Sequence, residues 1–166
     1  MVQLWVNLPA NRKMDPPRYQ ELRRDAIPTV SFPVETGTAR IIAGDFGRTL
    51  GAARTATPVI LWDVKLRKDA KVRIPIPSGV NAAVFVRSGS VWLSETHTID
   101  SRQLAVLTRE GNDAMTEAKA DTEFLVVGGE PIEEPVVAYG PFVMNTTEEI
   151  RQAINDVRSG SFGRLD

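Results

Sequence analysis

The single histidine has the widest chemical repertoire of any residue in this chain. His97 lies in the run Ser94-Glu95-Thr96-His97-Thr98-Ile99-Asp100, with two carboxylates nearby. A neighbouring carboxylate raises the pKa of an imidazole, so a histidine placed in this way could act as a general base. The same polar run is also typical of an exposed loop, and we favour that interpretation. The sequence therefore predicts no catalytic residue at this position.

Few side chains in this sequence are suited to binding a metal. The chain has one His and no Cys, which excludes a two-histidine site within one copy, a Cys-ligated cluster and a disulfide framework. Glu130, Glu133 and Glu134 gather within residues 128–135 and could hold a hard cation such as Ca²⁺. Glu134 could equally accept hydrogen bonds from nearby backbone amides, and we interpret the run as a rigid connector. No metal ligand and no cofactor-binding residue is predicted for this chain.

A moderately basic stretch from Arg12 to Arg24 offers a candidate contact surface. Within it, Arg18 and Tyr19 could contact an anion or a protein partner. The basic residues alternate with acidic ones, which favours a solvated arm with local ion pairs. Both interpretations stay open, and the solvated arm is the one that we favour.

The overall charge and hydropathy pattern exclude several classes of protein. Lys and Arg number 20 against 21 Asp and Glu, so the net charge is −1, whereas a general nucleic-acid binder needs a cationic field. No window approaches the roughly 20 apolar residues of a membrane span. Residues 1–9 lack the basic start and continuous apolar run of a signal peptide. We expect a cytoplasmic protein with neither a membrane partner nor direct contact with nucleic acid.

Apolar residues recur mainly with a period of two, which is typical of half-buried strands. Ser88-Gly89 joins two such runs and predicts a tight hairpin turn. The predicted strands are residues 2–8, 29–34, 39–43, 59–66, 72–76, 82–87, 90–94, 103–108 and 123–127. About nine or ten short strands favour a β-sandwich or barrel. The side chains predicted to face inward are those of Val84, Val86, Val91 and Leu93.

One helix is predicted near the end of the chain. Thr146 and Glu149 have the spacing of a capping box, and Gly160 is a typical helix stop. Ile150, Ala153, Ile154 and Val157 recur at i, i+3, i+4 and i+7, so one stripe faces a core. With 166 residues, the chain suits one domain. Its predicted parts are a leading strand at 1–9, an arm at 10–26, a β-sandwich at 27–144 and a helix at 146–160.

Several long runs of this sequence resemble the pirin family of the cupin superfamily. The runs are Gln-Leu-Trp-Val-Asn-Leu-Pro at 3–9, Pro-Arg-Tyr-Gln at 17–20, Gly-Gly-Glu-Pro at 128–131, Tyr-Gly-Pro-Phe-Val-Met-Asn-Thr at 139–146, Glu-Glu-Ile at 148–150 and Ser-Phe-Gly at 161–163. Their order and spacing also match. The resemblance spans nearly the whole chain but only the C-terminal part of the family's length.

The resemblance implies a mainly β fold, a cupin-type double-stranded β-sandwich or barrel of jelly-roll type with one C-terminal α-helix. In the family two cupins pack face to face, and the N-terminal cupin binds a ferrous ion through three histidines and a glutamate. Those ligands have no matching positions in this sequence. Iron is therefore expected in the full-length family, and no cofactor is expected in this chain.

The absence of the first cupin also shapes the expected partners. Exposed apolar surface costs roughly 25 cal/mol per Å², so we expect a homodimer or a protein partner to cover the face left by that cupin. Trp5, Arg18 and Tyr19 are the residues predicted to make this interaction.

The function predicted from these features is that of a non-catalytic binding or interaction module. The alternative is a part of a pirin-type, iron-dependent quercetin dioxygenase-like enzyme whose metal site lies in a missing or separate N-terminal cupin. A third interpretation is a carrier that holds a small molecule inside the barrel. It competes with a simpler one in which apolar residues fill a core.

Overall fold

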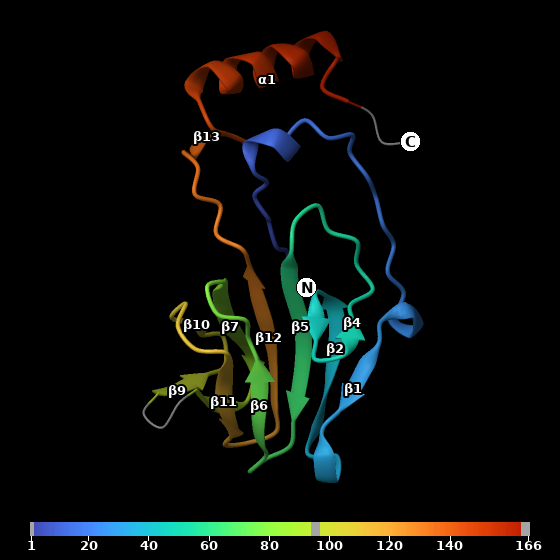
Figure 1. Ribbon diagram of the computed structural model, residues 1–166, viewed down its shortest axis with the longest axis vertical. Helices are drawn as coiled ribbons and strands as arrows, with labels where there is room; N and C mark the ends of the chain where they lie inside the picture. The colour runs from blue at the N-terminus through green and yellow to red at the C-terminus, as the bar shows by residue number, and fades with distance from the viewer. Residues whose placement is uncertain (1, 94–96, 164–166) are drawn as a thin grey trace. The chain divides into compact units, whose positions relative to one another are not determined.

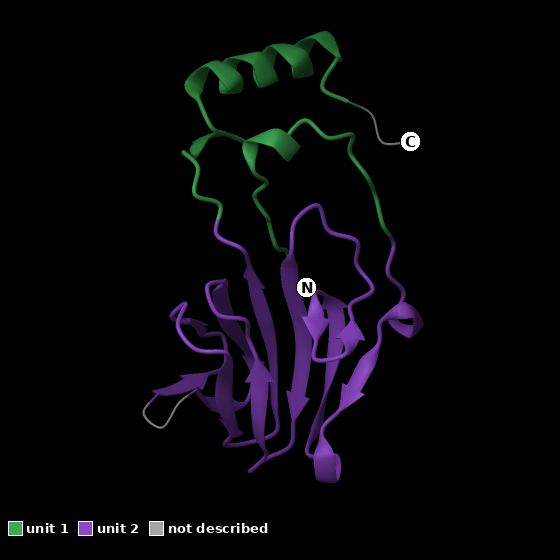
Figure 2. Cartoon of the chain, in the orientation of Figure 1, with its two compact units in different colours: residues 1–20, 132–166 green, residues 21–131 purple. Residues whose placement is uncertain are grey.

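The computed structural model describes residues 2–93 and 97–163. The chain divides into two compact units, one made of residues 21–131 and the other of residues 1–20 with 132–166 (Figure 2). The first unit holds two large antiparallel sheets, and the second holds the helix and a small two-stranded sheet (Figure 1). The single domain over residues 1–166 stays a prediction.

A six-stranded sheet and a four-stranded sheet form the larger unit. The six-stranded sheet has the order β1 (Thr29–Ser31), β2 (Gly37–Ala43), β5 (Val59–Leu66), β12 (Thr122–Gly129), β7 (Asn81–Ser88) and β10 (Leu104–Val106). The four-stranded sheet has the order β6 (Lys71–Pro75), β11 (Asp113–Ala118), β8 (Ser90–Leu93) and β9 (His97–Asp100). The pair β3 (Asp45–Phe46) and β4 (Thr49–Leu50) and the 3-10 turns Arg24–Ala26 and Pro33–Glu35 complete this unit.

The two large sheets share one hydrophobic core, so the unit is a β-sandwich. Buried residues of both sheets belong to a single apolar cluster, and within the described residues the sheets do not close into a barrel. Trp62 on β5 is fully buried, and the ring of Phe46 meets it edge-on at 5.0 Å between centroids. The four residues predicted to face inward are all buried, which confirms that prediction: Val84, Val86, Val91 and Leu93.

Ser88-Gly89 connects the two sheets and does not form a hairpin. β7 pairs with β12 and β10, whereas β8 pairs with β11 and β9. Gly89 has a φ of +79°, and a Cβ at this position would collide with the Asp121 carbonyl and the Thr122 hydroxyl. The predicted tight turn is confirmed and the predicted hairpin is wrong. Local turn chemistry favours a reversal, but packing decides whether the chain stays in one sheet or changes sheets.

Residues 2–9 form no strand, so the predicted leading strand is wrong. Val2, Leu4, Trp5 and Val6 are between 46% and 73% exposed, and neither set of alternating side chains is buried. Alternation determines which side chains share a face. A strand also needs a neighbour for its backbone hydrogen bonds, and the sequence pattern does not supply one.

The other strands were predicted unevenly. β5 has the predicted bounds Val59–Leu66, because a long apolar run bounded by turn residues is a strong local signal. In this unit, β3, β4, β9 and β11 were not predicted. β9 includes His97, which is exposed as expected but lies in a strand and not in a loop. β9 has a single neighbour in the described sheet, and such edge strands tolerate polar residues.

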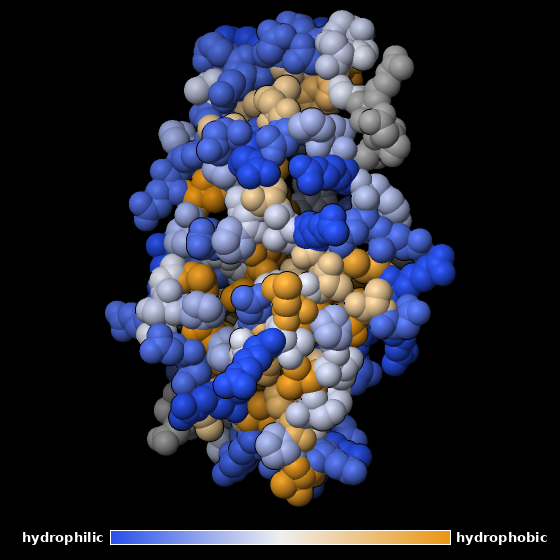
Figure 3. Space-filling view, turned by 45° about the vertical axis from the view of Figure 1, so that its right-hand side comes forward, coloured by the Kyte–Doolittle hydropathy of each residue, from blue (hydrophilic) through white to orange (hydrophobic). Residues whose placement is uncertain are grey.

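The smaller unit contains β13 (Val137–Tyr139), β14 (Phe142–Met144), the 3-10 turn Ala10–Arg12 and helix α1 (Thr147–Ser159). The capping box is confirmed, since the Thr146 hydroxyl accepts from the Glu149 amide at 3.1 Å and Glu149 Oε2 accepts from the Thr146 amide at 2.8 Å. Gly160 ends the helix with a φ of +75°. Of the predicted apolar stripe, Ile150 and Ala153 are buried, whereas Val157 is 50% exposed. Hydrophilic side chains lie along the outer surface of α1 (Figure 3). Among the described residues no helix is long and apolar enough to cross a membrane.

Candidate interaction site

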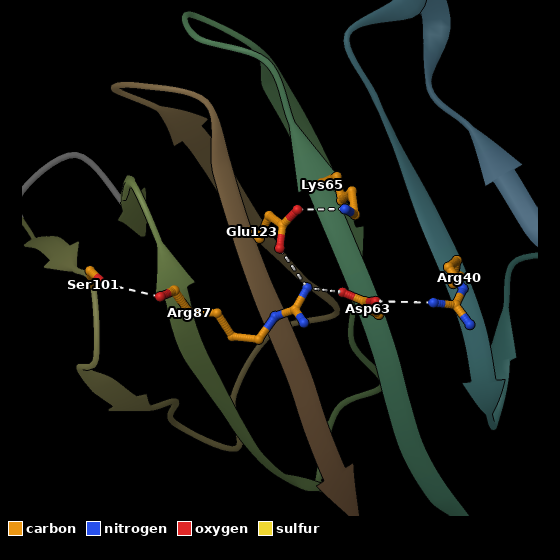
Figure 4. Close-up of polar contacts among 6 residues, drawn as sticks. All are labelled: Arg40, Asp63, Lys65, Arg87, Ser101 and Glu123. Carbon is orange, nitrogen blue, oxygen red and sulfur yellow. Dashed lines mark hydrogen bonds and ion pairs between the residues drawn. The ribbon is translucent and has the colours of Figure 1, made fainter. Parts of the chain in front are cut away.

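Five charged side chains form a continuous ion-pair network on the outer face of the six-stranded sheet (Figure 4). Asp63 alternates along β5 with the buried Trp62 and Val64, so it projects from the opposite face. Its partners come from β2, which lies beside β5, and from β7, which lies beyond β12. The network consists of Arg40 on β2, Asp63 and Lys65 on β5, Arg87 on β7 and Glu123 on β12.

Arg87 links the two carboxylates of this network. Its Nη2 donates to Asp63 Oδ1 at 2.8 Å and to Glu123 Oε2 at 2.9 Å. Arg40 Nη1 lies 3.5 Å from Asp63 Oδ2, and Lys65 Nζ donates to Glu123 Oε1. Asp63 is only 7% exposed. A carboxylate buried to this degree needs such partners, because an unpaired buried charge is costly.

The same network keeps Glu123 ionised. The hydrogen bond from Lys65 lowers the pKa of the Glu123 carboxyl below its ordinary value, and burial opposes this effect only in part. The charges of Lys65 and Arg87 lower the pKa further. Three cations therefore face two carboxylates. Both carboxylates are paired, and the network joins four strands of the sheet through its ion pairs.

The charged network continues into an apolar row along the same face. On β12, Leu125 pairs with Asp63 of β5 and with Phe85 of β7. Phe85 pairs in turn with Leu104 of β10. Directly paired residues of antiparallel strands point to one face. Leu104 is 57% exposed, and Val106 on the same strand is 78% exposed. Protein interfaces typically have an apolar centre and a polar rim, and this face has both an apolar and a charged area.

The residues predicted to interact, Trp5, Arg18 and Tyr19, all belong to the smaller unit and are all exposed. Trp5 is 73% exposed and Tyr19 is 79% exposed. Within the part of the chain that the structure describes, no hydrogen bond, ion pair or ring contact joins these three side chains. They do not form one cluster, and their role in binding stays a prediction.

The Glu134 carboxylate accepts hydrogen bonds from the protein, which is the alternative that the sequence analysis set against cation binding. Its Oε2 accepts from the Ala10 amide at 2.7 Å and from Asn145 Nδ2 at 2.9 Å. Asn145 Nδ2 also donates to the Pro135 carbonyl at 3.0 Å. The acceptance of a backbone amide is thus confirmed, although the amide comes from a segment more than a hundred residues away.

The donor set of this chain does not fit the iron that the family resemblance implies. The described residues include no group of three or more His, Cys, Asp and Glu side chains placed to hold a metal ion. The one histidine lies on β9, and the family's site uses three.

The ion-pair network was missed in the sequence analysis, although one signal for it was present. Asp63 and Lys65 interrupt the otherwise apolar run Val59–Leu66. An acidic residue inside a central strand implies a buried partner. The partners could not have been named, because they come from three other strands.

The sandwich, its sheet order and its terminal helix define a cupin-type β-sandwich domain. A quercetin 2,3-dioxygenase from Acinetobacter baumannii has a solved structure that superimposes with a TM-score of 0.90 and 42% identity, covering 96% of this chain and 55% of that one. The model of the pirin C-terminal cupin domain matches residues 61–163. The chain belongs to the pirin family.

Two relatives indicate how much of a pirin this chain represents. A Pseudomonas aeruginosa protein provisionally named a quercetin 2,3-dioxygenase is 44% identical over 164 residues, and human pirin is 39% identical over 168 residues. These matches cover 99% and 98% of this chain. The chain spans about 57% of the length of each relative.

Proposed function

We propose that this pirin-type cupin domain is a binding module that carries no catalytic site of its own. Its partner is a second copy of the chain or another protein whose surface covers the exposed apolar side chains. The observation that carries the proposal is the exposed apolar segment Val2–Val6. Its largest side chain, Trp5, is 73% exposed. Burial of such side chains against a partner removes apolar surface from water.

The outer face of the six-stranded sheet supports the same proposal. Its paired charges would give a partner a defined orientation, and the exposed Leu104 and Val106 would supply apolar contact. Interfaces typically combine such a polar rim with an apolar centre.

The test is the oligomeric state of the purified chain, measured by sedimentation velocity over a range of micromolar concentrations. We expect the wild-type chain to associate and the double variant Trp5→Ser, Val6→Ser to associate more weakly. Met14→Ser is a matched control, since Met14 is 64% exposed in the same unit. A wild-type chain that stays monomeric alone and with a metal-bearing pirin cupin would contradict the proposal.

A second candidate function is a share in dioxygenase activity. Relatives named for quercetin 2,3-dioxygenase match nearly the whole of this chain but are longer, and a metal-bearing cupin could lie in the remaining length. Oxygen uptake with quercetin, measured for a metal-bearing pirin cupin alone and after addition of this chain, separates the two functions. Uptake that does not change when this chain is added supports the binding module. Uptake that requires this chain supports the dioxygenase.

A further inference from the structure

A cavity of about 870 Å³ opens at one end of the sandwich. Its lining includes residues of β9 and β10, which are the terminal strands of the four-stranded and six-stranded sheets. Residues of β6, β8 and β11 complete the wall. All of these residues belong to the unit of residues 21–131. The cavity therefore lies where the two sheets of the sandwich separate.

The floor of the cavity is apolar and continuous with the core. Ile76 and Leu93 are buried, and four further side chains are partly buried and packed against the core cluster. Those four are Ile99, Ala105, Leu107 and Ala114. This floor still has apolar surface in contact with water. A ligand that covers it would gain roughly 25 cal/mol of binding free energy per Å² of apolar surface buried.

His97 places a polar group in this lining. It pairs directly with Leu93, and Ile99 pairs with Val91, so both β9 side chains lie on the core side of the four-stranded sheet. An imidazole can donate or accept a hydrogen bond. Thr116 also lies in the lining, and its hydroxyl donates to the Val72 carbonyl at 2.8 Å.

The charges of the lining disfavour an anionic ligand. Among the lining residues that the structure describes, the carboxylates of Glu110, Asp113 and Glu117 outnumber the lysine side chains, of which Lys71 is one. Hydrogen bonding from Lys119 lowers the pKa of Glu117, so this carboxylate stays ionised at neutral pH. Salt bridges join Asp113 to Arg73 and Glu117 to Lys71, both at 3.4 Å, which leaves little charge to attract a cation.

We propose that this cavity is a binding site for an uncharged, mainly apolar small molecule. The volume lies within the range of about 300–1,000 Å³ that small-molecule sites occupy. An apolar floor with one convergent polar group is the usual composition of such sites. The inference concerns the sandwich alone and does not depend on the proposed binding partner.

Trp92 supplies a spectroscopic reporter for this site. It lines the cavity, is 37% exposed, and has Lys119 Nζ 3.0 Å from its ring centroid. The other two tryptophans are Trp5 in the smaller unit and Trp62 in the buried core. Energy transfer from Trp92 to a bound dye therefore reports on occupancy of the cavity.

The experiment titrates the full chain with N-phenyl-1-naphthylamine, an uncharged aromatic dye, and follows dye emission. We expect saturable binding, and Trp92→Phe should reduce the dye emission excited through tryptophan without abolishing it, because Trp62 lies in the core of the same unit. Ala105→Phe fills the cavity and should weaken binding about tenfold or more. Ala120→Phe is the matched control, since Ala120 is exposed and lies outside the lining.

A second pair of variants keeps the test decisive if Ala105→Phe does not fold. Met115 lines the cavity at 50% exposure, and Leu50 lies outside it at 72% exposure. Met115→Asp should weaken dye binding several-fold, while Leu50→Asp should leave it unchanged. The proposal is overturned if the wild-type chain shows no saturable binding, or if the cavity variants bind the dye as tightly as their controls.

Discussion

The two compact units of this chain are stabilised in different ways. Every core residue of the described chain lies in the sandwich of residues 21–131, apart from Ile150 and Ala153 on α1. The smaller unit depends on specific hydrogen bonds instead, among them those to the Glu134 carboxylate and the Thr146 hydroxyl. The difference indicates that the sandwich is stabilised by packing, whereas the smaller unit is stabilised by a few polar groups in exact positions.

Removal of a core ring should have the largest effect. Phe124 on β12 is fully buried between the sheets, and Phe124→Ala should lower the free energy of unfolding by about 3–5 kcal/mol. Urea denaturation followed by tryptophan emission measures the change. Leu50→Ala, at an exposed position, should cost less than about 0.5 kcal/mol. Equal effects of the two variants would show that packing does not dominate in the sandwich.

Loss of the Glu134 carboxylate tests the smaller unit. Glu134→Ala leaves the Ala10 amide and Asn145 Nδ2 without their acceptor, and we expect a local loss of about 1–2 kcal/mol. Hydrogen exchange measured by mass spectrometry should accelerate around residues 10–12 and 145–149 and stay unchanged in β5 and β12. Glu133→Ala is the control, because Glu133 is exposed. Faster exchange throughout the sandwich would contradict the separation of the two units.

Removal of the helix cap should have a slightly smaller effect. Thr146→Ala deletes the acceptor of the Glu149 amide and should destabilise α1 by about 1 kcal/mol. Far-UV circular dichroism and exchange of the amides at 147–150 report the change. Thr147→Ala removes a hydroxyl one position further on and should preserve the cap. A result in which both variants behave alike would refute the specific role of Thr146.

The smallest effect concerns acid pH and the ion-pair network. The pKa of Glu123 is lower in the folded chain than its ordinary value, so its contribution to stability is present at neutral pH. That contribution is lost as the pH falls through the folded-state pKa. Because the side chain is 37% exposed, we expect less than about 1 kcal/mol.

Comparison of unfolding free energies at pH 7 and pH 3 tests this expectation. Glu123→Gln should destabilise the chain at pH 7, and its difference from the wild-type chain should shrink at pH 3. Glu130→Gln, at an exposed position, is the control. A difference that grows in acid would reverse the sign predicted from the network.

Features governed by neighbours in sequence were predictable. The capping box and Gly160 determine both ends of α1 through contacts within a few residues. The bounds of β5 follow from an apolar run between turn residues. The family was recognisable for a similar reason, because its signature runs are continuous stretches such as residues 139–146.

Features that depend on distant partners were not predictable. The same Ser88-Gly89 turn could close a hairpin or carry the chain to another sheet, and only the packing of β7 beside β12 selects the second. The alternating residues 2–8 have a strand pattern but no neighbouring strand. The network around Asp63 joins residues from four strands, so no single segment contains its signal.

The sequence by itself determined that this chain is mainly β, contains a capped helix near its end, and belongs among pirin C-terminal cupins. The tertiary structure decided which strands share a sheet, which carboxylates are paired, and where the two sheets separate to leave a cavity. The physical reason is the range of the interactions involved. Caps, turns and residue counts are local or compositional, whereas pairing, burial and cavities exist only once segments far apart in the chain have met.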